Sequence, residues 1–141
     1  MQIRKATSDD YVPVMKLYND FIGSDRYSRY DNDSFKKVLE SPTNFIYVAD
    51  DKGVIVGFIT FSIRNVVRYP RPIAELDELF VTSDHRKNGL GKQLMETVEN
   101  KAKELECYRI YIETNYRFKD AHAFYEALGY TNYGYHFIKN L

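Results

Sequence analysis

The stretch from residue 74 to residue 106 constrains the fold more than any other part of the chain. A β-rich run, residues 74–81, leads through a turn containing Gly89 and Gly91 into a segment with a single apolar stripe. The stripe has helical spacing and covers one face of a helix that ends near Glu106. Its members are Leu90, Leu94, Val98, Ala102 and Leu105. A strand that enters a helix in this way indicates a layered fold with helices on a sheet.

The rest of the chain is interpreted from the same periodicities and from its turn residues. We expect strands over residues 2–6, 45–49, 54–63, 74–81, 109–113 and 130–139, and helices after Ser8, after Asp33, from Leu90 and over 120–128. The first helix is expected to carry Val12, Met15, Tyr18 and Ile22 on one face, and Gly129 is expected to end the last helix in a left-handed conformation. This order predicts an α/β fold of the α+β type, with a central mixed, mostly antiparallel sheet flanked by about four helices.

Length and charge restrict the function further. The 141 residues have the size of one compact domain, so we expect residues 1–141 to form a single unit. Lys plus Arg and Asp plus Glu both number 20, which argues against nucleic acid or an anionic membrane as the main partner. Cys107 is the only cysteine, and neither a signal peptide nor a membrane span is evident. We therefore expect a cytoplasmic protein that acts on a small molecule.

The turn before the 90–106 helix has the properties of an anion site. Glycines at 89 and 91 let a ligand approach the backbone, and the first turn of a helix leaves amide groups unpaired. Arg86, Lys87 and Lys92 add positive charge at the same end. A dinucleotide fingerprint would need glycine at position 94, and a P-loop would need glycine at 86 and Ser or Thr at 93. Neither NAD nor ATP is therefore favoured as the ligand.

Two motifs instead resemble those of the GNAT (Gcn5-related N-acetyltransferase) superfamily. The first is Arg86-x-x-Gly89-x-Gly91, and the second is Asn115 followed by the run Asp120–Tyr130 with its Ala121-x-x-Phe124-Tyr125 core. The resemblance implies acetyl-CoA as co-substrate, bound between a splayed fourth and fifth strand pair. It assigns cofactor binding to Phe80, Val81, Arg86, Lys87, Asn88, Gly89, Leu90, Gly91, Lys92, Asn115, Ala121 and Phe124, and no metal.

The same resemblance implies a catalytic pair. Tyr125 would protonate the departing thiolate, since a phenol with a reference pKa of about 10 keeps its proton at neutral pH. Glu78 would act as general base on the incoming amine, with Asp77 and Glu75 as alternatives. Strand alternation places Asp77 and Glu78 on opposite faces unless a β-bulge intervenes, and the family strand carries a bulge here.

The resemblance further implies direct attack of the amine on acetyl-CoA in a ternary complex. Cys107 lies away from both motifs in the sequence, so an acetyl-cysteine intermediate is not expected. His122 and His136 are additional candidates for ligand contact, although single histidines are more often structural.

The sequence restricts the amine that accepts the acetyl group less than it restricts the acetyl donor. The segments 113–122 and 135–141 look closest to aminoalkylphosphonate N-acetyltransferases, and a phosphonate could meet Arg26, Arg29, Arg64 or Arg68. Aminoglycosides, polyamines and protein or peptide amines are the alternative acceptors. A non-catalytic CoA-binding sensor is the alternative from another class. The aromatic C-terminal segment, which includes Tyr133, Tyr135 and Phe137, is expected either to form a homodimer interface or to pack as one sheet face.

Overall fold

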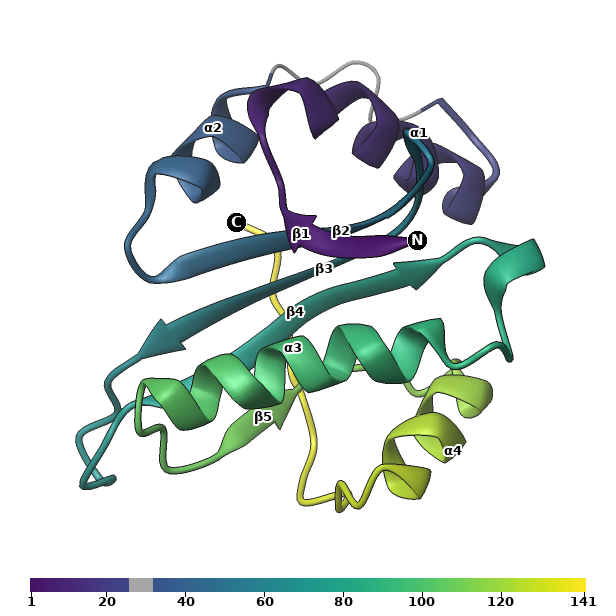
Figure 1. Ribbon diagram of the computed structural model, residues 1–141. Helices are drawn as coiled ribbons and strands as arrows, with labels where there is room; N and C mark the ends of the chain where they lie inside the picture. The colour runs from purple at the N-terminus through teal and green to yellow at the C-terminus, as the bar shows by residue number, and fades with distance from the viewer. Residues whose placement is uncertain (26–31) are drawn as a thin grey trace. The chain divides into compact units, whose positions relative to one another are not determined.

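A computed structural model describes residues 1–25 and 32–141 (Figure 1). In chain order its elements are β1 (Gln2–Lys5), α1 (Tyr11–Ile22), α2 (Asp33–Glu40), β2 (Asn44–Asp51), β3 (Val54–Arg64), β4 (Ile73–Val81), α3 (Leu90–Glu104), β5 (Ile110–Ile112) and α4 (Lys119–Ala127). Short 3-10 turns over Ser8–Asp10 and Ser83–His85 precede α1 and α3. The chain divides into two compact units, Met1–Tyr111 and Ile112–Leu141.

The sheet confirms the predicted fold class. Its strands lie in the order β1-β2-β3-β4-β5, and each pair from β1 to β4 is antiparallel. β5 lies beside β4 and runs in the same direction (Figure 1). A backbone hydrogen bond joins the two strands at one end, where the Ala74 amide of β4 donates to the carbonyl oxygen of Arg109, just before β5, at 3.0 Å. The sheet is therefore mixed and mostly antiparallel.

Helices of the first unit cover both faces of this sheet (Figure 1). α1 and α2 lie over one face, and α3 lies over the other. The core under α1 and α2 consists of Val14, Leu17, Phe35, Ile46, Val48, Ile55 and Phe58. α3 buries the predicted stripe as far as Ala102, whereas Leu105 follows the end of the helix and is 37% exposed. Both apolar surfaces of the sheet are thus covered, as its β-rich strands require.

The predicted face of α1 was right for Met15 and Tyr18, which pack against the core, and wrong for Val12 and Ile22, which are exposed. The helix buries Val14 and Leu17, which are 1% and 5% exposed, while Val12 is 72% exposed. Tyr11 at the start of the helix packs edge-on against Phe35 of α2, with ring centroids 5.6 Å apart. That contact turns the helix so that positions 11, 14, 15 and 18 face the core. Two sets of apolar residues with helical spacing overlap in α1, and packing against α2 determines which set is buried.

The predicted C-terminal strand was also wrong. No residue after Ile112 is in a strand in the part of the chain that the structure describes. Tyr133, Tyr135 and Phe137 are 86%, 94% and 89% exposed. Alternating aromatic residues fit a strand, but a strand exists only where its backbone pairs with another. The role of these side chains in a homodimer stays a prediction.

A close backbone approach fixes the end of β4. Gly57 of β3 is paired with Val81, and a Cβ atom at position 57 would lie 2.8 Å from the Phe80 carbonyl oxygen. That distance is shorter than real Cβ contacts allow, so a side chain here would push β3 and β4 apart. Glycine at this position lets the two strands stay paired up to the turn that leads into α3.

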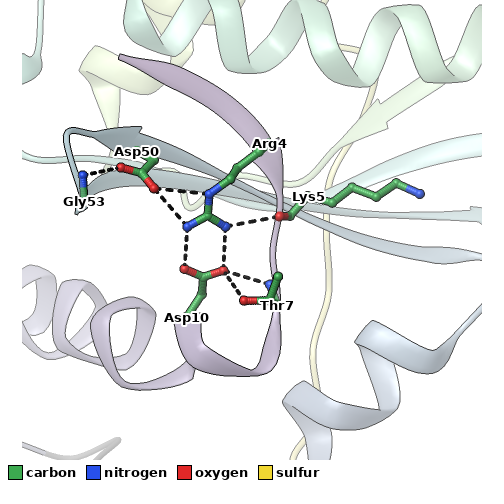
Figure 2. Close-up of polar contacts among 6 residues, drawn as sticks. All are labelled: Arg4, Lys5, Thr7, Asp10, Asp50 and Gly53. Carbon is green, nitrogen blue, oxygen red and sulfur yellow. Dashed lines mark hydrogen bonds and ion pairs between the residues drawn. The ribbon is translucent and has the colours of Figure 1, made fainter.

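A network around Arg4 ties β1 to the start of α1 and to the β2–β3 hairpin (Figure 2). The guanidinium makes two parallel hydrogen bonds to the Asp10 carboxylate, at 2.8 and 2.9 Å, and two to one carboxylate oxygen of Asp50, at 3.0 and 3.2 Å. Asp10 also accepts the Thr7 amide at 2.8 Å, and Asp50 accepts the Gly53 amide at 2.7 Å. The hydrogen bonds from Arg4 hold the pKa of the Asp10 carboxyl below its usual range.

Removing the Asp10 charge should weaken the fold. Asp10→Asn is expected to lower the free energy of unfolding by about 2 kcal/mol at pH 7, because it removes charged hydrogen bonds from a side chain that is 6% exposed. The pKa of Asp10 is lower in the folded than in the unfolded chain, so its stabilisation is present above about pH 4 and is lost as the pH falls further. Urea unfolding at pH 7, 4 and 3 should show the two proteins converging. Asp9→Asn, the same change at an exposed neighbour, is the control, and an equal loss there would contradict the assignment.

Candidate active site

A β-bulge interrupts β4 among its carboxylates. Thr60 of β3 is paired with Glu78, but the next residue, Phe61, is paired with Leu76. Asp77 is therefore the extra residue of a bulge. Asp77 and Glu78 are both exposed, and both line one cavity. The predicted bulge is present, and it places on one side two carboxylates that regular alternation would separate.

The β4 carboxylates differ in their partners. Glu78 accepts a hydrogen bond from the hydroxyl of Thr60, which is buried beside it. Glu75 forms an ion pair with Arg64 of β3, with Nε and Oε2 2.7 Å apart. Glu75 does not line the cavity. Glu78 is thus a carboxylate held in place by a neutral donor, whereas the charge of Glu75 is balanced by a cation.

The cavity has a volume of about 660 Å³ and lies wholly within the first unit. Its described lining comes from α1, α2, β2 and β3, and from Asp77 and Glu78 of β4. A volume of this size is typical of small-molecule sites. Sequence reasoning missed both this cavity and Thr60. The only signal for the walls was the aromatic and aliphatic content of α1 and α2, which also fits plain core packing.

The turn before α3 presents unpaired backbone amides. Lys87 and Gly89 are both left-handed, with φ of 63° and 81°. The amide of Gln93 donates to the Gly89 carbonyl oxygen at 3.1 Å, so the helical ladder begins there. The amides of residues 90–92 precede that bond and have no acceptor in the helix. Backbone amides in such a turn, at the positive end of a helix, form a concave site for an anion.

The side of β4 that faces away from β3, where β5 also lies, carries a second row of backbone amides. The Thr82 amide donates to the Val56 carbonyl oxygen of β3 at 2.9 Å, and backbone groups alternate in direction along a strand. The Phe80 amide therefore faces β3, and those of Leu79 and Val81 face away from it. Arg86 donates from Nε to the Val81 carbonyl oxygen at 2.8 Å on this edge. The geometry favours Val81, together with Leu79, as the amide donors to a ligand, while the Phe80 ring packs against Phe58.

In the second unit, α4 holds Tyr125 in an aromatic cluster. The Tyr125 ring lies edge-on to Phe124 and Tyr130, with centroids 5.3 and 6.2 Å away. Burial raises the pKa of Tyr125 to about 12. Gly129 is left-handed, with φ of 89°, and the Tyr130 amide donates to the Tyr125 carbonyl oxygen at 3.0 Å. The predicted glycine C-cap is confirmed, and it fixes the ring of Tyr130 against Tyr125.

Asn115 begins the turn that leads to α4. Its side-chain oxygen accepts the Arg117 amide at 3.0 Å, and its carbonyl oxygen lies 3.0 Å from His122 Nε2. His136 Nε2 lies 3.0 Å from Glu113 Oε1. Both histidines thus have partners within the second unit. The contacts leave the side-chain nitrogen of Asn115 as the group that could meet a ligand.

The arginines proposed for an anionic acceptor do not line the cavity where the structure describes them. Arg64 is paired with Glu75, and Arg68 donates to the Tyr111 hydroxyl at 3.2 Å while its guanidinium lies over the Tyr69 ring. Arg26 and Arg29 lie outside the described residues. Neither of the two described arginines supplies a charge to the cavity.

Other reactive groups fit a peripheral or structural role. Cys107 is half-buried, and burial raises the pKa of its thiol, which lowers its thiolate fraction. Within residues 1–25 and 32–141, no group of His, Cys, Asp and Glu side chains is arranged to hold a metal ion. In the same residues, none of the helices has the length and apolar character to cross a bilayer.

The structure groups the predicted site residues by unit. The first unit holds Glu78, Phe80, Val81 and the turn residues Arg86, Lys87, Asn88, Gly89, Leu90, Gly91 and Lys92. The second unit holds Asn115, Ala121, Phe124 and Tyr125. Lys92 lies at the start of α3, and its Nζ is 3.9 Å from Glu96 Oε1, four residues later in the helix. The charge of Lys92 is therefore partly balanced.

Comparison with known proteins identifies one matching family and several similar proteins. The model of the acetyltransferase (GNAT) family matches residues 10–130. The aminoalkylphosphonate N-acetyltransferase of Salmonella typhimurium is 27% identical over 99% of this chain and 91% of its own. A transcriptional regulator from Bacillus halodurans C-125 is 25% identical, and its crystal structure superposes with a TM-score of 0.91 over 99% of both chains. An aminoglycoside N-acetyltransferase in complex with CoA shares the fold, with a TM-score of 0.82 and 20% identity over 99% of this chain and 98% of that one.

Proposed function

Because the chain belongs to the acetyltransferase (GNAT) family and is an N-acetyltransferase, we propose that it transfers the acetyl group of acetyl-CoA to a primary amine of a small molecule. The proposal treats residues 1–141 as one catalytic domain and the reaction as direct attack in a ternary complex. The observation that carries it is the β4 bulge, which places Asp77 and Glu78 at a ligand-sized cavity on the strand that leads into the anion-binding turn.

Glu78 is the proposed general base. An alkylamine with a pKa of about 10.4 is almost entirely protonated at pH 7, and the ammonium form has no lone pair to attack a thioester. A carboxylate that lines the cavity can both attract the ammonium and accept its proton. The hydrogen bond from the Thr60 hydroxyl keeps the carboxylate of Glu78 oriented, while Asp77 adds a second negative charge beside it.

The turn before α3 is the proposed holder of the CoA pyrophosphate. The unpaired amides at the start of α3 and the left-handed residues Lys87 and Gly89 fit an anion of that size and charge. The outward amides of Leu79 and Val81 fit the amide-containing pantetheine arm and the thioester carbonyl. Acetyl-CoA would supply the acetyl group: a C–N bond forms, the C–S bond breaks, and CoA leaves as its thiol.

Tyr125 is the proposed donor to the departing sulfur, with Asn115, Ala121 and Phe124 beside the pantetheine. A phenol with a pKa of about 12 is a weaker acid than a thiol, whose reference pKa is about 8.5. Complete proton transfer from Tyr125 to a free thiolate would therefore be unfavourable. Its contribution is better described as a hydrogen bond that strengthens as negative charge grows on the sulfur.

Several classes of amine could accept the acetyl group at this site. The relative from Salmonella is named for aminoalkylphosphonates, which makes that class the first candidate by likeness. Aminoglycosides, polyamines and peptide amines are the others. A CoA-binding sensor without catalysis would not need a carboxylate held in the lining of a cavity, on the strand that leads into the cofactor turn.

The proposal is tested by release of free thiol from acetyl-CoA in the presence of a panel of primary amines. We expect amine-dependent thiol release, with the N-acetylated product seen by mass spectrometry. Calorimetry with CoA alone provides the second readout. Binding of CoA without acetylation of any amine would favour the sensor, and absence of both would refute the proposal.

A further inference from the structure

A cluster of tyrosines and arginines joins the β3–β4 loop to the start of β5, within the first unit (Figure 1). Its members are Arg68, Tyr69, Tyr108, Arg109 and Tyr111. The Tyr108 amide donates to the Pro72 carbonyl oxygen at 2.7 Å and so ties the loop to the segment before β5. The cluster lies where β4 begins, whereas the cofactor turn follows the other end of that strand. It is therefore separate from the candidate active site.

The rings and guanidiniums of this cluster hold one another in place. Tyr69 and Tyr108 are stacked, with ring centroids 5.0 Å apart. The guanidinium carbon of Arg68 lies 4.8 Å from the centroid of the Tyr69 ring. That of Arg109 lies 4.9 Å from the centroids of both rings. A guanidinium over an aromatic face is attracted by the ring and loses part of its freedom. The side chain of Arg68 is thus ordered before any ligand binds.

The two hydroxyl groups of the cluster leave one proton unused. The hydroxyls of Tyr69 and Tyr111 form a hydrogen bond with each other, and Tyr111 also accepts a hydrogen bond from Arg68 at 3.2 Å. Each phenol brings one proton, and only one of the two protons can lie between the two oxygens. The other has no acceptor among residues 1–25 and 32–141. The cluster can therefore donate one phenolic hydrogen bond to a ligand, close to the guanidinium of Arg68.

Arg68 brings a positive charge to the same place. Its side chain is exposed, and its hydrogen-bond partners are the neutral phenols of Tyr69 and Tyr111 rather than a carboxylate. A guanidinium has five N–H groups, so several remain for a ligand. Residues 65–72 of the loop include a second exposed arginine, Arg71, and no acidic residue. By contrast Arg64, at the end of β3, donates from Nε to Glu75 at 2.7 Å.

The surroundings of Tyr69 favour negative charge on an oxygen atom. Hydrogen bonds from Tyr111 and Arg68 hold the pKa of the Tyr69 hydroxyl below its ordinary value. The same hydrogen-bond donors and the same positive charge are available to an oxyanion that approaches from outside. Charge-assisted hydrogen bonds from a guanidinium are among the stronger polar contacts in proteins.

We propose that this cluster binds the phosphate group of a small molecule, either free phosphate or a phosphate ester. Arg68 donates two N–H groups to its oxygens, and the unused phenolic proton of the tyrosine pair is donated to another. A phosphate group suits these donors better than a carboxylate, because it carries close to two negative charges and has three or more acceptor oxygens. Binding at this site does not depend on acetyl transfer, so the proposal goes beyond the proposed function.

The test is an NMR titration of the protein labelled with ¹⁵N and with ¹³C in its tyrosines. At constant ionic strength, we expect inorganic phosphate to shift the signals of Tyr69 and Tyr111 and to bind at least about fivefold more tightly than acetate. Methyl phosphate is the second arm. If it binds as well, the site accepts an ester, and if only inorganic phosphate binds, the ligand is the free ion; both results support the proposal. Shifts confined to residues 86–92, or equal affinity for acetate, would overturn it.

Two matched substitutions test the role of Arg68. Arg68→Gln removes an exposed guanidinium, and the affinity for inorganic phosphate at Tyr69 and Tyr111 should fall by about tenfold. Arg64→Gln removes the same charge from the other end of the loop, where the guanidinium is already paired with Glu75, and should leave the affinity within about twofold. Equal losses in the two variants would show attraction by general charge alone and would overturn the proposal.

The ionisation of Tyr69 gives a second readout that general attraction would not move. Deprotonation of Tyr69 adds negative charge beside the ligand and removes a proton from the donor pair, so phosphate affinity should fall as the pH rises through the pKa of Tyr69. By linkage, saturating phosphate should raise that pKa. The groups that face Tyr69 are Arg68, Tyr108, Arg109 and Tyr111, and the ¹³C signal of Tyr69 reports its titration separately from theirs. A pKa of Tyr69 that stays the same in saturating phosphate would contradict the proposal.

Discussion

Replacing Tyr125 with phenylalanine should lower kcat by about a hundredfold and leave the KM for acetyl-CoA within about twofold of the original. The change removes only the hydroxyl, so the ring contacts with Phe124 and Tyr130 are retained and the fold of α4 should be unaffected. The loss falls on kcat because the hydrogen bond to sulfur gains strength only as the C–S bond breaks. Initial rates of thiol release, with each substrate varied at saturation of the other, separate the two parameters.

The pH dependence distinguishes this role from an indirect one. With a pKa of about 12, Tyr125 keeps its proton from pH 6 to pH 10, so the loss in Tyr125→Phe should be nearly constant across that range. Tyr130→Phe, the same change on the neighbouring ring, is the matched control and should retain most of the activity. A loss that appeared only in the KM for acetyl-CoA, or an equal loss in Tyr130→Phe, would show that the hydroxyl has no part in the departure of sulfur.

Elements whose signals are local could be predicted from the sequence. The α3 stripe from Leu90 to Ala102 is buried because it recurs once per turn and no competing face exists. The β2–β3 turn at Lys52 and Gly53 is left-handed at both residues, with φ of 55° and 89°, as a two-residue hairpin requires. In each case the chemistry of a few adjacent residues is enough to decide the backbone conformation.

Elements that depend on a distant partner could not be predicted in this way. The inner face of α1 is set by the contact between Tyr11 and Phe35, residues that lie on different helices. The aromatic alternation at Tyr133, Tyr135 and Phe137 is compatible with a strand, yet pairing needs a free edge that sequence periodicity does not reveal. Local pattern therefore overestimated regular structure at the C-terminus.

In the candidate site, too, features formed by adjacent residues could be predicted, whereas features formed by distant residues could not. The glycines and basic residues of the turn before α3 are adjacent in the sequence, so an anion site there could be predicted. The side on which Asp77 lies depends on the register between β3 and β4, and only the family resemblance indicated the bulge. The hydrogen bond between Thr60 and Glu78 joins residues eighteen positions apart on paired strands, and no local pattern signals it. The cavity, which draws on α1, α2, β2, β3 and β4, is the least local feature and was missed.

Replacing Glu78 with glutamine should have the largest effect of all, lowering kcat/KM by about a thousandfold at pH 7. Glutamine keeps the shape of the side chain and can still accept the Thr60 hydroxyl proton in a hydrogen bond, but it cannot take a proton from the ammonium. The deficit should shrink as the pH rises towards the pKa of the amine, about 10.4, because the neutral amine then forms without a base. Profiles of kcat/KM against pH for both proteins, measured by thiol release, would show this convergence.

Asp77→Asn separates proton transfer from charge attraction. It removes the same unit of charge from the same cavity, so it should weaken binding of the ammonium by about tenfold at most, and its pH profile should stay parallel to that of the unchanged enzyme. Glu75→Gln removes a carboxylate that is paired with Arg64 outside the cavity and should have the smallest effect. If Asp77→Asn instead gave the larger loss, together with the recovery at high pH, Asp77 would be the base and Glu78 the attracting charge. Parallel profiles for all three variants would mean that none of these carboxylates accepts the proton, and that the bulge serves only to bind the amine.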